Sequence, residues 1–507
     1  MSIAKEAYAE LEAVVGKEFI SDKEYILAGN RSKTPEIPFE YHSADAIILP
    51  GCVEEVQQIV KICNKYGIYF VTTVTGCSVD AFPNRAGSLL IHLKRMNRII
   101  EINAEDRIAI IEPGVRHVQL YPELRKLGLS YVAAAVGPGG SVLANYTSTS
   151  GDNHNQHGTS RANRYLLGVE MVTPEGEIVR TGSLQTDSGW FCPDGPGPGL
   201  RGIVKGFFGN HGQMGVITRA AIALNPCKGP RETVTEGLSP NHHVYHRSEC
   251  SKVFAFTFEN LDGVCDAMLK IGEAEIASTV QKFFYLTLAV MMTESADEFW
   301  ELWPKVKEEM AIPLVVHLAT NSLEEMAYEE KILMEIIAET GGTRAKPEYE
   351  DWWESHMDFF MIVSMLQRTL RLGGGWMPIK LGADSVSHMT EVGKSISEFI
   401  YDFTETGKIF DAPENFQIVP MEYGHFAHIE LLFMWNRLDP AAGKGVAEFR
   451  ARSRETDLAH HYHAETLACL NQTSVQLGPL YDNYHVWLRA LKESFDPNNV
   501  ANPILQN

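Results

Sequence analysis

The chain has 507 residues with 44 basic and 65 acidic side chains, which gives a formal net charge of −21. Hydrophobic residues make up 45% and aromatic residues 10%, a composition that excludes a disordered acidic chain and is typical of a globular protein. The acidic balance argues against nonspecific nucleic-acid binding, which needs clustered basic residues, and against docking onto an anionic membrane. At roughly 100–200 residues per domain, the length predicts two to four domains or subdomains.

The eight cysteines form no Cys-x-x-Cys pair, which argues against zinc-ribbon and thioredoxin-type sites, and they form no run of iron–sulfur ligands. They are too sparse for a disulfide scaffold, which predicts reduced thiols in a cytoplasmic protein. The amino terminus carries early acidic residues and no long apolar core, unlike a secretory signal. The apolar run 283–292 has about ten residues, too few for a membrane span.

The first third of the chain alternates short apolar strands with helical spacing, which predicts a mixed α/β region with short connections. A hairpin follows, and longer segments after it predict a second domain of roughly 230 residues. A last helix stops at Asp496-Pro497. The predicted strands are 46–49, 69–73, 88–92, 99–102, 108–111, 166–172, 177–180 and 283–292, and the predicted helices are 53–66, 296–311 and 484–492.

Two stretches rich in glycine and small polar residues are typical of ligand-binding loops. The turn Gly76-Cys77-Ser78 directly follows a strand, where successive backbone N–H groups can form a concavity for an anion. A structural turn is the alternative, because the sequence matches neither a Walker loop nor a dinucleotide GxGxxG. The run 137–140 and the loop 145–158 combine glycines with neutral donors suited to a polar ring or a pyrophosphate, and an Ω-loop without a ligand is their alternative.

The order of these pieces resembles the flavoprotein superfamily of vanillyl-alcohol oxidase and para-cresol methylhydroxylase (PCMH). That superfamily also contains D-lactate and D-2-hydroxyglutarate dehydrogenases and alkyl-dihydroxyacetone-phosphate synthase. The resemblance extends over about 180 residues of the first half and returns at the carboxyl end. The matching segments are 49–56, 75–78, 96–102, 112–115, 139–145, 168–182, 209–218 and 495–499, with Asn502-Pro503 after the last of them.

The resemblance implies an α+β fold in which a two-part, PCMH-type FAD-binding domain is closed by a C-terminal segment. A central α+β cap domain would lie over the flavin. The implied boundaries are 1–230 for the FAD-binding domain, 231–450 for the cap and substrate domain, and 451–507 for the C-terminal segment. The match covers the FAD-binding domain well and the cap poorly, and a homodimer is expected from family analogy alone.

The resemblance also implies which residues contact FAD, and it leaves open whether the flavin is covalently attached to a cap histidine. The pyrophosphate would lie on Thr75, Gly76, Cys77, Ser78 and Val79. The flavin would be lined by Pro138, Gly139, Gly140, Ser141, Asn145, Ser150, Gly151, His157 and Gly158. Gly215, Val216 and Ile217 would support the adenine or ribose side.

The catalytic side chains must then come from the cap, where the segment 421–430 predicts a strand that continues through residue 434. With a period of two, His428 and Glu430 share one face and Tyr423 and His425 share the other. A histidine is suited to accept a hydroxyl proton because its pKa lies near neutrality, and a neighbouring carboxylate would orient the imidazole. The alternative is that these histidines are hydrogen-bonded strand residues without a catalytic role.

Three further patterns bear on the substrate. The phenol-oxidising branch carries a Tyr-Arg pair near its end, whereas the nearest spelling here is Tyr462-His463. The run 460–463 is rich in histidine, but neighbouring residues point in different directions, and we predict no metal site. Arg368 and Arg371 could clamp a carboxylate, with solvated ion-pair partners as the alternative.

The sequence therefore predicts an FAD-dependent oxidoreductase that moves a hydride from an alcohol or 2-hydroxy-acid C–H of a small-molecule substrate to flavin N5. Electrons would pass to oxygen or to a redox carrier protein. The first alternative is an oxidase or hydroxylase of para-substituted phenols, and another is a non-redox flavin synthase of the alkyl-glycerone-phosphate kind. An alternative of another class is a flavin-binding protein without redox turnover.

Overall fold

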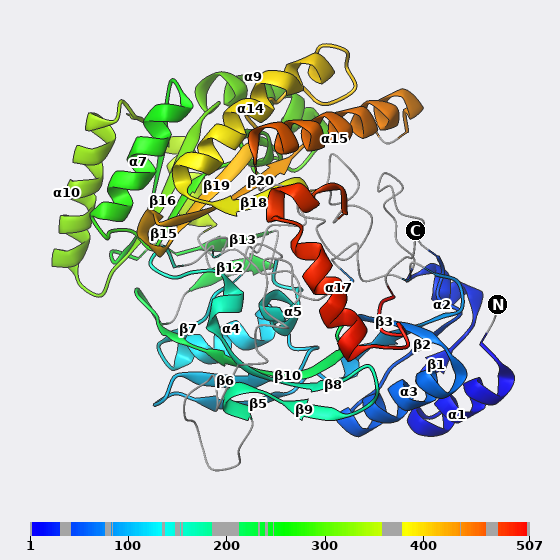
Figure 1. Ribbon diagram of the computed structural model, residues 1–507. Helices are drawn as coiled ribbons and strands as arrows, with labels where there is room; N and C mark the ends of the chain where they lie inside the picture. The colour runs from blue at the N-terminus through cyan, green and yellow to red at the C-terminus, as the bar shows by residue number, and fades with distance from the viewer. Residues whose placement is uncertain are drawn as a thin grey trace.

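The computed structural model describes residues 3–30, 42–76, 83, 85–133, 137–147, 153, 156–184, 212–231, 234–238, 242–246, 248–356, 378–436, 438–462 and 475–503. Within these residues three main sheets form two units, one above the other in Figure 1. We call the two lower sheets with their helices the N-terminal unit, and the seven-stranded sheet with its helices the cap unit. No described helix is both long enough and apolar enough to cross a membrane.

The first sheet of the N-terminal unit has the order β1-β2-β4-β3, and its central strands β2, β4 and β3 run parallel. Helix α3 packs on it through Val56, Ile59 and Val60, and it ends at Gly67 as the helical spacing predicts. The elements are α1 (Lys5–Val15), β1 (Ile20–Ser21), α2 (Glu24–Ala28), β2 (Ala46–Ile48), α3 (Val53–Tyr66), β3 (Tyr69–Thr73), β4 (Ser88–His92) and η1 (Leu93–Arg95).

The second sheet has the antiparallel order β5-β6-β10-β8-β9 and contains the predicted hairpin as β8 and β9. Its strands are β5 (Ile99–Asn103), β6 (Ile108–Ile111), β8 (Leu166–Val172), β9 (Ile178–Arg180) and β10 (Val216–Ala223). Around it lie α4 (His117–Lys126), β7 (Leu129–Ser130), α5 (Val142–Thr147), η2 (Ala162–Tyr165), η3 (Gly182–Leu184) and β11 (Asn225–Pro226).

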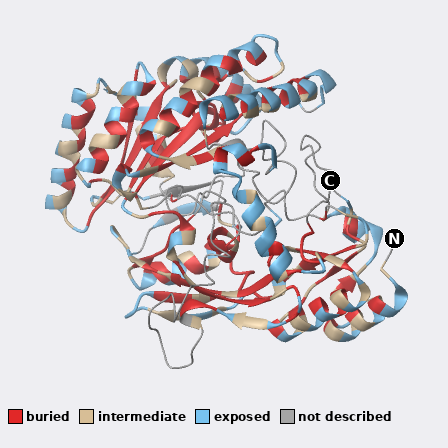
Figure 2. Cartoon of the chain, in the orientation of Figure 1, coloured by how far each residue is buried: buried red, intermediate tan, exposed pale blue. Residues whose placement is uncertain are grey.

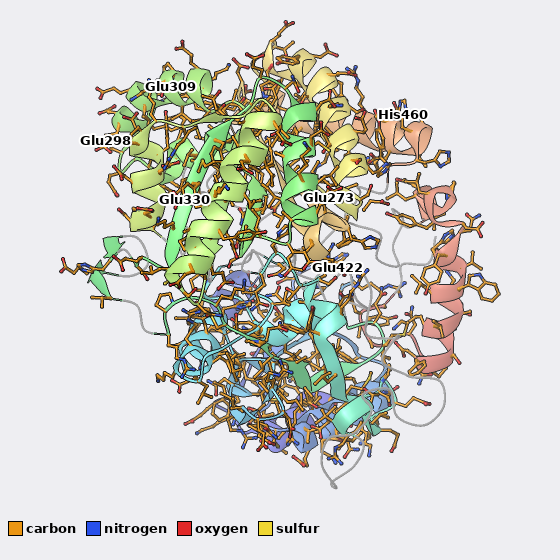
Figure 3. All side chains as sticks on the ribbon, turned by 90° about the vertical axis from the view of Figure 1, so that its left-hand side faces the viewer. Glu273, Glu298, Glu309, Glu330, Glu422 and His460 are labelled. Atoms are coloured by element: carbon orange, nitrogen blue, oxygen red, sulfur yellow. The ribbon has the colours of Figure 1, made fainter. Side chains whose placement is uncertain are left out.

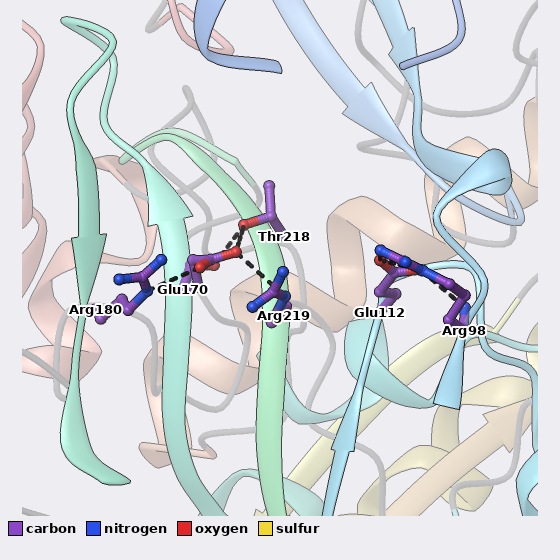
Figure 4. Close-up of polar contacts among 6 residues, drawn as sticks. All are labelled: Arg98, Glu112, Glu170, Arg180, Thr218 and Arg219. Atoms are coloured by element: carbon purple, nitrogen blue, oxygen red, sulfur yellow. Dashed lines mark hydrogen bonds and ion pairs between the residues drawn. The ribbon is translucent and has the colours of Figure 1, made fainter. Parts of the chain in front are cut away.

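Two buried carboxylates tie the strands of this second sheet together (Figure 4). Glu112 receives a bidentate pair of bonds from the Arg98 guanidinium, of which the shorter, from Nη2, is 2.7 Å. Glu170 accepts hydrogen bonds from Arg180 Nε at 2.9 Å and Thr218 Oγ1 at 3.1 Å. Each buried carboxylate therefore has an arginine as its hydrogen-bond partner inside the sheet.

The cap unit is built on a seven-stranded sheet of order β17-β14-β16-β15-β19-β20-β18. Helices α7, α10 and α14 share one apolar core with one face of this sheet, and α8, α9 and α11 share another with part of the opposite face. Figure 2 shows the sheet as a nearly continuous buried layer between exposed helix surfaces. The sheet is therefore covered from both sides at its β14–β16 end.

The bounds of the remaining elements follow the chain. The strands are β12 (Thr235–Leu238), β13 (His242–Tyr245), β14 (Ser251–Thr257), β15 (Thr279–Lys282), β16 (Pro313–Ala319), β17 (Thr343–Arg344), β18 (Pro378–Asp384), β19 (Phe416–Met421) and β20 (Phe426–Leu432). The helices are α7 (Leu261–Glu273), α8 (Tyr285–Met291), α9 (Ala296–Glu309), α10 (Leu323–Glu339), α11 (Pro347–Ser355), α14 (Val386–Thr404), η4 (Glu422–Gly424), α15 (Pro440–His460), η5 (Gly478–Tyr481) and α17 (Tyr484–Phe495).

One predicted element is of the wrong type. The run 283–292 was expected to be a strand, but the structure forms helix α8 there, with all of its residues buried. A short run that is apolar on every side has neither a period of two nor one of 3.6, so periodicity cannot separate a buried strand from a buried helix. The predicted helices 296–311 and 484–492 are present as α9 and α17, with slightly different ends.

The carboxyl end of the chain returns to the first sheet. After α17 the backbone runs beside β3, where Phe70 N–H donates to the Val500 carbonyl at 2.8 Å and Asn502 N–H donates to the Phe70 carbonyl at 2.7 Å. This tail therefore adds a bridge at the strand that leads into the predicted pyrophosphate turn.

A buried ion pair holds the tail in this position. Lys492 and Asp496 form a salt bridge in which both side chains are 1% exposed. The Lys492 ammonium also donates to the carbonyls of Gln213 at 2.7 Å and Ala501 at 2.5 Å. The Asp496 carboxylate accepts from the Val500 and Ala501 N–H groups at 3.0 and 2.8 Å. The pair thus joins α17, the tail and the approach to β10 in one network.

We expect Lys492→Met to lower the free energy of unfolding by about 3–5 kcal/mol, because it leaves the Asp496 carboxylate buried without its cation. Urea denaturation monitored by tryptophan fluorescence measures the change. Lys65→Met is the matched control, since Lys65 pairs with Glu10 at 2.6 Å on the surface and should contribute less than about 1 kcal/mol. Equal losses in the two variants would contradict the structural importance of the buried pair.

A second buried lysine makes stability depend on pH. Lys282 Nζ donates to the carbonyls of Glu414 at 2.5 Å and Phe416 at 2.7 Å, and burial lowers its pKa to about 7. Between pH 7 and the ordinary lysine pKa, the unfolded chain binds a proton that the folded chain does not, so stability rises with pH. Below pH 7 both states carry the proton and this contribution is flat.

We expect the stability difference between the native protein and Lys282→Met to grow in favour of the native protein from pH 7 to pH 10. The slope is at most about 1.4 kcal/mol per pH unit, the value for one proton. Denaturant unfolding at several pH values gives both curves, and their difference cancels the other titrating groups. Parallel curves over this window would show that Lys282 is protonated in the folded state.

Candidate functional site

The end of β3 carries the first group of predicted ligand-binding residues. The Thr73 hydroxyl is buried and has no hydrogen-bond partner in the described part of the chain. Thr75 and Gly76 follow and are exposed, and Gly76 has a φ of +68° with open space where a Cβ would stand. An orphaned hydroxyl beside a left-handed glycine fits the predicted pyrophosphate turn. Cys77, Ser78 and Val79 lie outside the described residues.

The segment 137–141 lies across the first turn of α4. The Pro138 and Gly140 carbonyls accept hydrogen bonds from the first N–H groups of α4, at 2.9 Å from Val118 and at 3.1 Å from His117. These N–H groups have no partner within their own helix, so the loop is fixed by satisfying them. Gly139 has open space where a Cβ would stand, which leaves the outer side of the loop accessible to a ligand.

Two side chains that follow this loop are anchored inward. Ser141 Oγ donates to the Pro113 carbonyl at 2.6 Å. Asn145, on α5, donates from Nδ2 to the Ser141 carbonyl at 3.0 Å and lies 2.9 Å from Nε2 of His117. His117 was absent from the predicted site, and no sequence signal marks it, because folding brings it to Asn145 from 28 positions away.

The loop that follows α5 contains several buried polar atoms that lack a hydrogen-bond partner in the described part of the chain: Gln156 Oε1, His157 Nε2 and Ser160 Oγ. His157 Nδ1 donates to the Ile276 carbonyl at 3.2 Å, and burial lowers its pKa to about 4, so its Nε2 carries a lone pair. Buried polar groups without partners are rare unless a ligand satisfies them. The loop therefore fits the predicted flavin contact, while Ser150 and Gly151 lie outside the described residues.

Gly215, Val216 and Ile217 begin strand β10. A Cβ at Gly215 would lie 2.3 Å from the Val172 carbonyl, so the glycine is required by the close approach of β8. The side chains of Val216 and Ile217 are buried in the hydrophobic cores of the N-terminal unit. Any contact from these two residues to a nucleotide would have to come from the backbone.

In the cap unit, His428 and Glu430 share one face of β20, as predicted from the period of two, and are 3% and 4% exposed. Glu430 lies opposite Gln417 of β19, and Gln417 Nε2 donates to Gln281 Oε1 of β15 at 2.6 Å. Both glutamines are buried. They belong to a polar row on three adjacent strands that the sequence analysis did not identify.

This polar row lies on the face of the sheet opposite to α7, α10 and α14. The alternate residues Ile429 and Leu431 pack into the core with those helices, so His428 and Glu430 point the other way. In Figure 1 the strands β15, β19, β20 and β18 lie above α4 and α5 of the N-terminal unit, with β12 and β13 between them. The row is therefore turned toward the unit that carries the predicted flavin loops.

Tyr423 and His425 do not lie on that strand. The expected continuous strand 421–434 is broken, because β19 ends at Met421 and a tight turn, η4, precedes β20. Tyr423 has a φ of +55°, and both side chains are exposed. Their predicted sharing of a strand face is therefore wrong, since left-handed residues turn the backbone instead of extending it.

The same turn forms a joint between the two units. Glu422, Tyr423 and Gly424 have φ values of +51°, +55° and +84°. Glu422 N–H donates to the Thr159 carbonyl at 3.1 Å, and Tyr423 N–H donates to the His157 carbonyl at 3.2 Å. Two left-handed residues other than glycine are costly, and their contacts with the N-terminal unit hold them there.

A second segment of the cap, directly before β15, contacts the same loop. His157 N–H donates to the Ser278 carbonyl at 2.6 Å, in addition to the side-chain bond to Ile276. Arg164 forms an ion pair with Glu422 across the joint. Figure 3 shows Glu422 at the level where the two units meet, whereas the other labelled glutamates lie on the cap helices.

Two glycines allow Tyr423 to approach closely from both sides. A Cβ at Gly158 would lie 2.6 Å from the Tyr423 ring, and a Cβ at Gly272 of α7 would lie 2.1 Å from the Tyr423 carbonyl oxygen. Gly158 thus serves the joint as well as the predicted flavin loop. A side chain at Gly272 would meet backbone, which cannot rotate away.

The described residues contain no group of three metal-ligating side chains. In the histidine-rich run, His460 stacks on Tyr462 with ring centroids 5.3 Å apart, and His463 lies outside the described residues. Arg368 and Arg371 also lie outside them.

Comparison with known proteins identifies the N-terminal unit. Residues 44–182 match the FAD binding domain family. The chain is 26% identical over 293 residues to glycolate oxidase subunit GlcD of Bacillus subtilis, which covers 55% of this chain and 53% of that protein. It is 32% identical over 153 residues to the flavoprotein subunit of 4-cresol dehydrogenase from Pseudomonas putida, covering 28% and 27%. The chain thus spans about half or less of the length of these curated relatives.

Solved structures show the same overall fold. A 4-ethylphenol oxidase from Gulosibacter chungangensis superimposes with a TM-score of 0.76 at 20% identity, covering 99% of this chain and 97% of that chain. p-Cresol methylhydroxylase superimposes with a TM-score of 0.75 at 18% identity, covering 98% and 95%. The resemblance to the FAD-linked superfamily is confirmed, FAD is the cofactor of this domain, and the mixed helix and strand fold is of the PCMH type.

We expect Gly272→Ala to lower the free energy of unfolding by about 1–3 kcal/mol, because the new methyl group meets the Tyr423 backbone. Gly443→Ala is the matched control, since Gly443 is also helical but has nothing within 4 Å of its Cβ position. There the substitution should raise stability by about 0.5–1 kcal/mol. Urea denaturation checks the opposite signs, and a gain in both variants would mean that the joint yields without cost.

Proposed function

We propose that the protein is an FAD-dependent oxidoreductase that acts on the CH–OH group of a small alcohol or 2-hydroxy acid. The N-terminal unit and the C-terminal segment, 1–230 and 451–507, hold FAD, and the cap, 231–450, covers the flavin and binds the substrate. FAD supplies a hydride acceptor and passes the electrons to oxygen or to a redox carrier protein. The FAD-linked oxidoreductases among the relatives support the reaction class, since they include a glycolate oxidase subunit and D-lactate dehydrogenases.

The observation that carries this proposal is the buried pair His428 and Glu430 on the cap face turned toward the flavin loops. A neutral imidazole at His428 accepts the hydroxyl proton of the substrate as the C–H bond is broken. Glu430 lies on the same face, about 7 Å along the strand, where its negative charge stabilises the imidazolium that forms. Because His428 and Glu430 are 3% and 4% exposed, bulk water has little access to them.

The buried glutamines of the polar row orient the substrate. Gln417 lies beside Glu430 across the strand pair, and its amide is fixed by the 2.6 Å bond to Gln281. Amides donate and accept hydrogen bonds without adding charge, so they suit a hydroxyl or carbonyl group of the substrate.

A second candidate function is oxidation of a para-substituted phenol. It is favoured by the sequence similarity to the 4-cresol dehydrogenase flavoprotein subunit over 153 residues. The missing Tyr-Arg pair disfavours it, because the nearest spelling is Tyr462-His463. A flavin-binding protein without turnover is the alternative of another class.

The absorption spectrum of the purified protein tests these functions first. Bleaching of the flavin bands by D-lactate or glycolate under anaerobic conditions supports the hydroxy-acid function, and bleaching by 4-ethylphenol supports the phenol function. A flavin that none of a panel of alcohols, hydroxy acids and phenols reduces would favour binding without turnover. Acid precipitation of the same sample shows whether FAD is covalent, since a covalent flavin stays in the pellet.

We expect His428→Asn to slow flavin reduction by the bleaching substrate roughly 10²–10⁴-fold, because the general base is removed while FAD still binds. Anaerobic stopped-flow absorbance measures the rate. His425→Asn is the matched control, since it makes the same change three positions away in the exposed turn. Equal effects at both histidines would refute the assignment.

A further inference from the structure

Three buried polar side chains form a chain beneath the loop 137–141. His117 Nδ1 lies 2.6 Å from the Tyr131 hydroxyl, and His117 Nε2 lies 2.9 Å from Asn145 Nδ2. The rings of His117 and Tyr131 are stacked with centroids 5.5 Å apart. All three side chains are buried, and none of them is needed to complete a helix or a sheet.

The direction of each hydrogen bond follows from one fixed acceptor. The Ser141 carbonyl oxygen, 3.0 Å from the Asn145 side chain, can only accept, so the Asn145 amide nitrogen must face it. The second hydrogen of that nitrogen then points to His117 Nε2, which accepts it. His117 therefore carries its proton on Nδ1 and donates it to the Tyr131 oxygen. Burial lowers the pKa of His117 to about 3, so the imidazole stays neutral at physiological pH.

This arrangement leaves one group of Asn145 unused. Both amide hydrogens are engaged, and no donor in the described part of the chain reaches the carboxamide oxygen. Asn145 is 4% exposed as a whole residue, but its carboxamide oxygen is not among the fully buried side-chain atoms that lack a partner, so a ligand can reach this oxygen. Asn145 thus presents an acceptor, and only an acceptor, at the segment predicted to line the flavin.

We propose that His117 is a positioning residue that locks the Asn145 carboxamide so that its oxygen accepts a hydrogen bond from the isoalloxazine N3–H of FAD. The inference rests on the proposed function for the presence of a flavin at this loop. Oxidised isoalloxazine has a single N–H donor, at N3, and all its other polar ring atoms accept. An asparagine whose amide is free to rotate can bind either a hydrogen-bond donor or an acceptor of the ligand. The locked Asn145 amide presents only its oxygen and therefore selects a donor.

The flavin analogue 3-methyl-FAD tests the proposal directly, because it replaces the N3–H by a methyl group and leaves the redox ring intact. Apoprotein is titrated with FAD and with 3-methyl-FAD, and binding is followed by flavin fluorescence. We expect the native protein to bind FAD roughly tenfold more tightly than 3-methyl-FAD, the value of one buried hydrogen bond. Asn145→Ala and His117→Phe should reduce this preference to within about twofold.

Two variants separate orientation from a general loss of packing. His117→Gln keeps an acceptor for the Asn145 amide and should restore much of the preference that His117→Phe loses. Thr147→Val is the matched control, because Thr147 is buried on the same helix and, among the described residues, its hydroxyl bonds the Leu143 carbonyl. It should retain the full preference. The midpoint potential of the bound flavin should shift in the same direction in Asn145→Ala and His117→Phe and stay unchanged in Thr147→Val.

The outcomes distinguish this inference from the proposed function. A native protein that binds both flavins equally well overturns the N3–H contact while FAD binding stands. Retention of the full preference in His117→Phe overturns the role of His117 alone. A native protein that binds neither flavin overturns the proposed function and the inference with it.

Discussion

Two segments of the cap bind a single loop of the N-terminal unit through backbone hydrogen bonds. The proposed site depends on these bonds, because they fix the register of the strands that carry it. The backbone N–H of His157 donates to the carbonyl of Ser278, the residue before β15, and the His157 carbonyl accepts from Tyr423 N–H in the β19–β20 turn. The polar row continues from both places, since β15 carries Gln281 and β20 carries His428. A shift of one residue in any of these strands would turn that strand's members of the row to the opposite face of the sheet.

The contacts with the N-terminal unit explain why the β19–β20 turn is strained. Glu422 and Tyr423 take left-handed conformations that an ordinary hairpin would assign to glycine or asparagine. Their N–H groups thereby reach carbonyls of the other unit, and the ion pair of Glu422 with Arg164 adds to the hold. The N-terminal unit is closed by a comparable long-range contact, because Lys492 and Asp496 bring the end of the chain to β3. Such contacts order distant segments, and they must offset the entropy of doing so.

Local signals in the sequence were sufficient for α3 and for most strands of the N-terminal unit, but not for α1, α4 or α5. Helix α3 and strands β3 and β4 lie where periodicity and the flanking glycines place them, because each is decided by neighbours within one element. Helix α8 was taken for a strand, since a run that is buried on all sides shows no period. The β19–β20 turn was missed because Gly424 is its one conventional turn residue, and the two residues before it are held by tertiary contacts.

The candidate site also contains some residues that the sequence predicts and others that it does not. His428 and Glu430 were found because two residues on one strand share a face whatever the rest of the fold does. The pairs Gln281 with Gln417 and His117 with Asn145 were not, because each joins elements far apart in the chain. In each pair, the sequence around one residue gives no indication of its partner.

The distribution of similarity along the chain bears on the substrate selection that we propose for the cap. The FAD binding domain match ends at residue 182, whereas the fold similarity to the two phenol-oxidising enzymes extends over nearly the whole chain. A fold can be kept while the residues of its site are exchanged. A wrong substrate would leave polar groups of that face without hydrogen-bond partners and would therefore bind more weakly than the right one. In this chain the face offers a histidine, a carboxylate and two coupled amides, so under the proposed function the substrate would match a fixed pattern of buried donors and acceptors.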